Sequence, residues 1–358
     1  MQKHFMTILA LFFVVQTGWA DDVNSSVSLT EYYAAANDKG GNELRMALFD
    51  VIKGHTSIGY KQLGTIMQWS DTENADGQNV IDIYSDCTYT TSGPISWGNA
   101  SSVGGAMNRE HTVPQSWFDE DEPMKSDAFH VYPSDCKANN NRSAYLYGEF
   151  SGNGTSNSSG KCKETGKLST GNSNSIASYT YENQTYTPTA TWSGKVYEPA
   201  DEYKGDLARS YFYMATRYAD KCTTWSGGAF STARNGLGVY TAELMLKWHR
   251  LDPVSEKELI RNEVIYGNPQ YNKSSKKQGN RNPFIDYPEL AEYIWGDKQE
   301  MTITLTALDS PYANEQPLPD GIESIGGERM AAKKMLVNGQ LIILVDGKKY
   351  TLMGQPIQ

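Results

Sequence analysis

The chain has 358 residues, of which 39% are hydrophobic, and a formal net charge of −10 at pH 7. This length allows one large domain or two ordinary ones, with ample apolar side chains for a core. The acidic balance argues against binding nucleic acid through overall charge, because affinity for phosphate comes mainly from Lys and Arg. Beyond the N-terminal leader no stretch is apolar enough for a helix that spans a membrane, so we expect no membrane span.

The N-terminus has the pattern of a secretory signal peptide. Lys3 and His4 precede an apolar run over residues 5–15, and Gly18 and Ala20 supply small residues for cleavage. We therefore predict that residues 1–20 are a signal peptide. The mature protein is expected to be secreted, outside the cell or at the outer cell surface, with the periplasm as the alternative.

The first half of the chain combines helical spacing with short extended segments. Residues 29–51 predict a helix, because Leu44, Leu48 and Val51 fall on one face. Two short strands are predicted over residues 80–84 and 109–113, and Pro114 ends the second. A turn that enters a helix is predicted over residues 135–145. A strand, a loop and a helix in this order can place a base and a metal ligand on opposite walls of a small cleft.

The second half is predominantly helical after a long loop. Residues 151–192 are rich in Ser, Thr, Gly and Asn and predict loop, with one hairpin near residues 178–186. Further helices are predicted over residues 206–218, 242–249, 256–265 and 289–295. Residues 297–321 predict a linker that includes a strand-like stretch, residues 302–305. Within residues 322–358, Asn-Gly and Asp-Gly turns predict a three-stranded meander.

Four cysteines fit an oxidising compartment. They are Cys87, Cys136, Cys162 and Cys222. Cys136 and Cys162 bracket an Asn-rich segment and a flexible Gly-rich run, so we expect these two to form a disulfide. Free buried thiols are the alternative. No pair has CxxC or CxxH spacing, so a structural zinc site is not expected.

Residues 108–114 and 137–143 carry the groups that phosphodiester hydrolysis requires. His111 can be the general base, because imidazole is half-neutral near physiological pH. Glu110 and Asn139 offer the oxygen ligands that Mg²⁺ or Ca²⁺ prefers. The pattern predicts a secreted metal-dependent nuclease.

Charge is distributed unevenly along the chain. Residues 119–122 are all acidic and predict a solvated turn, whereas residues 271–281 contain no acid. The cations of this second segment are Lys273, Lys276, Lys277 and Arg281. It is a candidate track for substrate phosphates, with an ordinary exposed loop as the alternative.

These motifs resemble the bacterial endonuclease I family, a branch of the His-Me finger (ββα-metal) nucleases. The similarity is centred on Arg109-Glu110-His111. The matching segments follow one another in the order of the family, and together they cover about residues 30–296. The other similar segments are residues 113–117, 132–135, 139–143, 198–201, 204–209, 248–255 and 279–286.

The resemblance implies an α+β fold with a ββα-metal core inside a mostly helical nuclease domain of residues 21–296, followed by the short β meander. It implies that His111 is the general base and that Glu110 and Asn139 hold one divalent cation. That cation would be Mg²⁺, with Mn²⁺ or Ca²⁺ as alternatives. The implied substrate is DNA, and RNA as well, cut by a monomer with little sequence preference.

Two positions depart from the family pattern. The arginine that steadies the scissile phosphate has no counterpart between His111 and Asp127. Arg142 is the first candidate for that role, because three residues past Asn139 on a helix places it on the same side, and Arg109 is the second. His130 stands where the family often has Asn, and a buried, hydrogen-bonded imidazole is preferred over a catalytic one.

Residues 322–358 resemble the short tails that direct proteins of some Gram-negative bacteria through type IX secretion. That resemblance implies the secretion machinery as a partner. The alternative is a small β appendage with no address function.

Two other functional classes remain open. A secreted binding module on a degenerate nuclease fold would not need Glu110, His111 and Asn139. A zinc hydrolase could use His111 and His130, but no HExxH pattern or third histidine lies nearby. Chelation followed by metal add-back separates a magnesium nuclease from a zinc hydrolase.

Overall fold

The computed structural model describes residues 28–314 and strand residues 332–337, 340–345, 348–350 and 356–357. The predicted signal peptide lies outside the described residues, as does the last part of the predicted linker. No helix in the part of the chain that the model describes is long and apolar enough to cross a membrane. Helices and several small sheets share one chain, which confirms the predicted α+β class.

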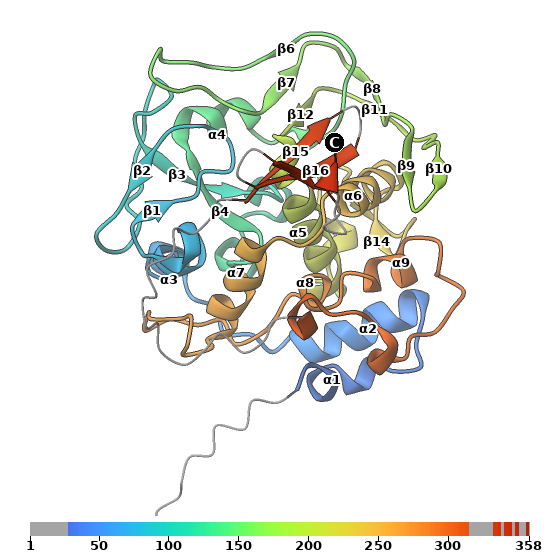
Figure 1. Ribbon diagram of the computed structural model, residues 1–358. Helices are drawn as coiled ribbons and strands as arrows, with labels where there is room; N and C mark the ends of the chain where they lie inside the picture. Colours follow the sequence, from blue (N-terminus) through green and yellow to red (C-terminus); the bar gives the residue numbers. More distant parts are fainter. Residues whose placement is uncertain (1–27, 315–331, 338–339, 346–347, 351–355, 358) are drawn as a thin grey trace, which may run out of the picture.

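A buried helix, α5 (Lys204–Arg217), lies at the centre of the molecule (Figure 1). It packs against α6 (Val239–Leu251), α2 (Gly41–Ile52) and α8 (Pro283–Asp286). Beside it, α7 (Glu256–Tyr266) packs on α3 (Leu63–Ser70). Because neighbours surround α5, it is buried almost throughout and not along one face only.

The helices predicted in the second half are confirmed by α5, α6, α7 and α9 (Leu290–Ile294). The single helix predicted over residues 29–51 is wrong. The chain forms α1 (Leu29–Tyr32), a 3₁₀ turn at Ala34–Ala36, and then α2. Gly40 and Gly41 separate them, since a Cβ at Gly40 would meet the Met301 carbonyl oxygen at 2.0 Å and Gly41 has φ +52°.

Strand β3 (Met107–His111) pairs antiparallel with β4 (Val131–Asp135), and α4 (Cys136–Arg142) follows β4 directly. His111 lies opposite Val131. The Asp135 side chain caps α4 by accepting a hydrogen bond from the Ala138 amide at 2.9 Å, so strand and helix join without an intervening loop. The helix packs on both strands. The extended stretch and the helix predicted here are confirmed, each within a few residues.

Two other predicted strands are wrong. Only β1 (Asn79–Val80) is extended, pairing with β2 (Tyr89–Thr90), because the Asp82 carboxylate accepts from the Tyr84 amide at 2.9 Å and turns the chain. Residues 302–304 pair with no strand among the described residues, and Leu305–Ala307 form a 3₁₀ turn.

The long loop carries short strands at intervals. Its hairpin, β9 (Tyr179–Tyr181) with β10 (Gln184–Tyr186), confirms the prediction near residues 178–186. A second pair joins β8 (Ser173–Ser175) to β11 (Thr191–Ser193).

A four-stranded sheet closes over the far side of α4. Its order is β5 (Leu146–Tyr147), β12 (Val196–Glu198), β7 (Lys167–Ser169) and β6 (Gly154–Thr155). Helix α4 contacts β7 of this sheet. A minor hairpin, β13 (Phe230–Ser231) with β14 (Gly236–Leu237), precedes α6.

The C-terminal strands form an antiparallel meander in the order β15 (Ala332–Val337), β16 (Gln340–Val345), β17 (Lys348–Tyr350) and β18 (Pro356–Ile357). The predicted meander has three strands, and the structure adds the short β18. The Asn-Gly and Asp-Gly turns themselves lie outside the described residues.

The predicted Cys136–Cys162 disulfide is wrong, because Cys162 pairs with Cys87 and their Cα atoms are 5.1 Å apart. The strand-like contact between Asp86 and Lys163, with an amide–carbonyl hydrogen bond of 3.0 Å, brings these two cysteines together. Cys136 begins α4 and turns its sulfur inward. Cys136 and Cys222 are free buried thiols.

Removal of this disulfide is expected to destabilise the fold by about 2–4 kcal/mol, because it closes a long loop in the unfolded chain. Its cysteines are 75 residues apart. Urea unfolding of the Cys87→Ser/Cys162→Ser double variant measures the effect. In a reducing buffer the wild type should lose the same stability and match the variant. Equal stability of oxidised and reduced wild type would contradict the pairing.

Candidate active site

The β3–β4 hairpin and α4 bring the predicted base and metal ligands together. Side chains alternate along β3, so Arg109 and His111 share one face and Glu110 points to the other. Arg109 and His111 both pack on Tyr60. Glu110 contacts Tyr84 beneath the strand. The predicted base, His111, and the carboxylate of Glu110 are therefore consecutive residues on opposite faces of β3.

His111 is held in one tautomer. Its Nε2–H donates to the Lys125 carbonyl oxygen at 3.0 Å, and a carbonyl can only accept, so Nε2 carries the proton and Nδ1 keeps its lone pair. The side chain is 6% exposed. Burial lowers the pKa of His111 to about 3, with a smaller contribution from the neighbouring His130. The ring is thus neutral at physiological pH, which is the form that a general base requires.

His130 lies behind His111, with their ring centroids 5.5 Å apart in an edge-to-face contact. Its Nε2–H donates to the Met124 carbonyl oxygen at 2.6 Å, so successive carbonyls, at Met124 and Lys125, fix the two imidazoles. His130 is fully buried, and burial lowers its pKa to about 4. It is the buried, hydrogen-bonded residue that the sequence predicts.

Glu110 is a buried carboxylate with a cationic partner. Only 1% of the residue is exposed, and its Oε1 accepts from the Tyr84 hydroxyl at 2.8 Å and lies 3.2 Å from Arg142 Nη1. Burial raises its pKa to about 7, while Arg142 opposes the rise. Oε2 accepts no hydrogen bond from the described part of the chain. A cation bound at Oε2 would favour the ionised form.

Asn139 is tied to the same strand. Its Nδ2 donates to the Arg109 carbonyl oxygen at 3.0 Å, which directs Oδ1 away from β3. No group within the described ranges donates to Oδ1. One carboxylate oxygen of Glu110 and the amide oxygen of Asn139 therefore accept no hydrogen bond from the described residues, and both are hard ligands suited to Mg²⁺, which keeps several of its waters. The donor set fits the predicted cation.

Arg142 lies in the interior and donates hydrogen bonds to the backbone at the end of β3. Its Nη1 donates to the His111 carbonyl oxygen at 3.0 Å, and Nη2 donates to that of Thr112. The residue is 1% exposed, and its guanidinium lies over the Tyr147 ring at 4.7 Å. These contacts, with the ion pair to Glu110, make Arg142 a positioning group for β3 and for the carboxylate.

Arg109 occupies a different setting. Its Cζ lies 4.3 Å from the Tyr60 ring centroid and 4.7 Å from that of Trp97. Within the described residues no carboxylate pairs with Arg109, whereas Arg142 pairs with Glu110. Burial lowers the pKa of the Arg109 guanidinium. Lys125 Nζ also lies over the Tyr60 ring, at 5.1 Å. Two cations thus meet at the aromatic ring that stacks on His111.

A model of the endonuclease I family matches residues 40–289. The chain belongs to the endonuclease I family. It is similar to a protein described as extracellular ribonuclease from Bacillus amyloliquefaciens, with 32% identity over 277 residues that cover 76% of this chain and 81% of that protein. A protein of the same description from Bacillus subtilis (strain 168) is 31% identical over 268 residues, covering 74% and 78%.

Membership of the endonuclease I family makes this chain a nuclease with a nucleic-acid substrate. All the residues singled out for catalysis and metal binding lie inside the matched region. That region also agrees with the range of similarity, about residues 30–296, that the sequence motifs predict.

The predicted phosphate track is only partly accessible. Arg281 is buried, and its guanidinium pairs with Glu263 at 2.6 Å and Asp286 at 2.8 Å, because an arginine inside the fold needs carboxylate partners. Lys273 and Lys277 are exposed and Lys276 is half-buried. The cationic surface of this segment therefore consists of lysines and excludes Arg281.

The sequence did not point to Tyr60 or Lys125. Tyr60 begins a 3₁₀ turn at Tyr60–Gln62, far from β3 along the chain, and no local pattern marks it. Lys125 follows an acidic run and forms an ion pair with Glu120 at 2.5 Å. Only the packing of these segments around His111 reveals that both residues border the site.

Proposed function

We propose that this endonuclease I family member is a secreted, divalent-metal-dependent endonuclease that hydrolyses RNA and DNA with little sequence preference. The observation that carries the proposal is the arrangement around β3. There, His111, a neutral imidazole with a free Nδ1, follows Glu110 directly on β3, and the Asn139 side chain is hydrogen-bonded to the Arg109 carbonyl of the same strand. Glu110 and Asn139 each offer an oxygen that accepts no hydrogen bond from the described residues. We further propose that β3, β4 and α4 are the ββα-metal core of a His-Me finger nuclease.

The chain's own groups divide the chemistry. His111 Nδ1 accepts a proton from the attacking water, while the Lys125 carbonyl holds the ring in position. Arg109, which no acid neutralises within the described residues, contacts a phosphate oxygen through its outer nitrogens. Arg142 favours the ionised form of Glu110 and keeps its carboxylate aligned.

Glu110 Oε2 and Asn139 Oδ1 would hold the cation, and we propose Mg²⁺, with Mn²⁺ or Ca²⁺ as alternatives. When bound, the cation supplies positive charge to the phosphate and to the leaving 3′ oxygen. Water attack then releases a 3′ hydroxyl and a 5′ phosphate. This chemistry does not involve the ribose 2′ hydroxyl, which is why we propose DNA as well as RNA.

The zinc alternative fits this arrangement poorly. The Nε2 atoms of His111 and His130 both donate to backbone carbonyls, so neither is free to bind a metal. His130 Nδ1 is buried without a partner and is enclosed by the core, not open to a metal-bound water. Hard oxygen ligands favour magnesium over zinc.

Secretion is supported by two observations. Both curated relatives are described as extracellular. The Cys87–Cys162 disulfide is consistent with an oxidising compartment. The signal peptide of residues 1–20 and the type IX sorting tail of residues 322–358 stay predictions, as does the monomeric state.

The ends of the products test the proposed reaction. The protein is incubated with Mg²⁺ and either RNA or closed circular DNA, and the termini are identified by labelling. We expect both polymers to be cut, with 5′ phosphate and 3′ hydroxyl ends. A 2′,3′-cyclic phosphate on RNA, with the DNA circle left intact, would contradict hydrolysis by water. Binding without cleavage of either polymer would favour the binding-module alternative.

A further inference from the structure

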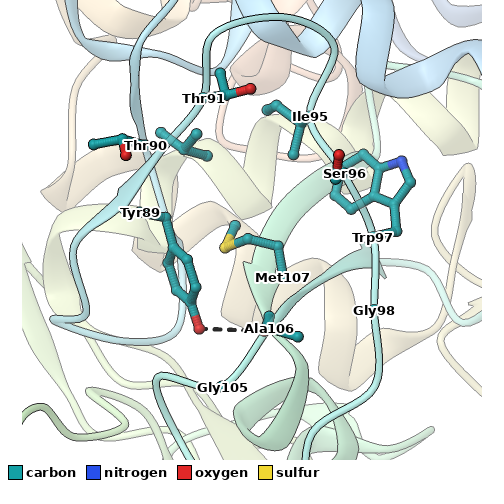
Figure 2. Close-up of a pocket in the computed structure, with 11 residues that line it drawn as sticks. Tyr89, Thr90, Thr91, Ile95, Ser96, Trp97, Gly98, Gly105, Ala106 and Met107 are labelled. Carbon is teal, nitrogen blue, oxygen red and sulfur yellow. Dashed lines mark hydrogen bonds between the residues drawn. The ribbon is translucent and has the colours of Figure 1, made fainter.

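A cavity of about 350 Å³ opens beside the N-terminal end of β3. Its lining consists of Val80, Tyr89, Thr90, Thr91, Ile95, Ser96, Trp97, Gly98, Gly105, Ala106 and Met107, and we call it the Trp97 pocket. In Figure 2, Met107 lies between the Tyr89 ring and Trp97, and Thr90 and Thr91 are drawn above them. The volume falls in the range of small-molecule sites, about 300–1,000 Å³.

The pocket and the proposed active site lie along the same strand, β3. Met107, Arg109 and His111 share one face of the strand, and at about 3.4 Å per residue Met107 lies about 14 Å from His111. Trp97 links the two places, because it lines the pocket and its ring also lies 4.7 Å from the Arg109 guanidinium. A nucleic-acid strand whose phosphate contacts Arg109 would therefore reach the pocket close to the phosphodiester bond that is cut.

The lining determines the kind of occupant. It offers aromatic and apolar surface from Tyr89, Trp97 and Met107, together with hydroxyl groups from Thr90 and Ser96. It contains no charged side chain, so it suits neither a phosphate nor a metal ion. The Tyr89 hydroxyl is already engaged with the Asp135 carboxylate at 2.6 Å, which holds the ring in place. A flat, neutral, hydrogen-bonding group matches this surface.

We propose that the Trp97 pocket is a base-binding subsite, which accepts one unstacked nucleobase of a substrate strand whose neighbouring phosphate contacts Arg109. This proposal rests on the proposed nuclease function and defines its substrate class. Bases inside a duplex remain stacked and paired, so only a single-stranded or unpaired segment can fill the pocket. The protein should accordingly favour single strands.

The test compares Trp97→Ala with Trp97→Phe, which keeps an aromatic face, and with Trp192→Ala. Trp192 is also half-buried but lies on β11, outside the pocket. Steady-state constants are measured with Mg²⁺ on a single-stranded RNA and on a duplex of the same sequence. For the single strand we expect Trp97→Ala to raise KM about 5- to 140-fold, which corresponds to about 1–3 kcal/mol, the range for stacking on an aromatic side chain. The duplex should lose severalfold less than the single strand, because it is affected only through the contact of Trp97 with Arg109, and Trp97→Phe should recover most of the loss on the single strand.

A further variant, Thr90→Glu, tests the pocket independently of Trp97. Thr90 is exposed, so Thr90→Glu adds a negative charge to the pocket with little risk to folding, and it should also weaken single-strand cleavage selectively. Equal losses on single strand and duplex, or losses in Trp192→Ala as large as in Trp97→Ala, would overturn the proposal.

Binding separates this proposal from the proposed function. In EDTA, affinity for a fluorescent single-stranded oligonucleotide should fall in Trp97→Ala and not in Trp192→Ala. If the wild type binds in this way but cuts no polymer, the nuclease function fails and the subsite stands. If it cuts both polymers and Trp97→Ala binds and cuts single strands normally, the subsite fails alone.

Discussion

Replacement of His111 by Ala is expected to lower kcat on RNA and DNA by about 10²- to 10⁴-fold, the usual contribution of a general base. The reason lies in the fixed tautomer. Nε2 is committed to the Lys125 carbonyl and Nδ1 is left as the proton acceptor. The neighbouring imidazole cannot replace it, because His130 is buried behind it and anchored through its own Nε2. Initial rates at saturating substrate measure the effect.

The matched control is His111→Gln, whose amide nitrogen reaches the position of Nε2 and can still donate to the Lys125 carbonyl but cannot accept a proton in catalysis. Both variants should lose activity alike, while unfolding curves show that His111→Gln stays closer to wild type in stability. Imidazole added to the buffer should partly restore His111→Ala. Activity within a few-fold of wild type in His111→Gln would remove His111 from the mechanism.

Replacement of Arg142 by Ala is expected to lower the free energy of unfolding by about 3–5 kcal/mol, because it leaves the buried Glu110 carboxylate without its cation. The carbonyls of His111 and Thr112 each lose one hydrogen bond as well, although the Tyr211 hydroxyl still donates to Thr112. Urea unfolding in EDTA measures this loss without a contribution from bound metal. Arg142→Lys keeps the charge but not the forked geometry, so it should fall between wild type and Arg142→Ala.

The contrast with Arg109→Ala decides which arginine serves the substrate. Arg109 has aromatic contacts and no ion pair in the described residues, so its loss should cost only about 1–2 kcal/mol of stability. We expect it to lower kcat/KM about 10²-fold, as for the loss of one group that stabilises charge on the reacting phosphate. If Arg142→Ala instead folds as stably as wild type and loses activity, Arg142 is the phosphate contact and our assignment is reversed.

The residues that perform the proposed chemistry could be predicted from sequence because they are local. Glu110 and His111 are neighbours on one strand, and Asn139 sits on the helix that follows the partner strand, so the order of elements already brings them together. The helices α5 to α7 could be predicted for a similar reason, because spacing within one segment defines each of them.

The orientation of the arginine side chains could not be predicted, because position on a helix does not decide which way a long side chain turns. Arg142 is on the predicted side of α4, yet its guanidinium points inward to Glu110. Arg281 likewise looked exposed in a segment free of acid, whereas its two carboxylate partners, Glu263 and Asp286, come from flanking segments.

The predicted disulfide pairing was wrong for a related reason. Cys162 is close in sequence to Cys136, but the loop that carries it returns to residues 86–87 through backbone pairing that no local pattern predicts. Tyr60 and the Trp97 pocket also depend on contacts between segments far apart along the chain. The proposed reacting groups could be chosen from the sequence, and only the packed structure revealed what holds and surrounds them.

In the proposed mechanism a bound divalent cation and His111 are both needed to cut phosphodiester bonds. The most direct test is the rate of cleavage of RNA and of circular DNA by the wild-type protein after dialysis against EDTA, followed by titration with Mg²⁺, Mn²⁺, Ca²⁺ or Zn²⁺. We predict no cleavage in EDTA and full recovery with Mg²⁺ or Mn²⁺, whereas Zn²⁺ should not restore activity. Undiminished cleavage of either polymer in EDTA, or recovery with Zn²⁺ alone, would contradict the account.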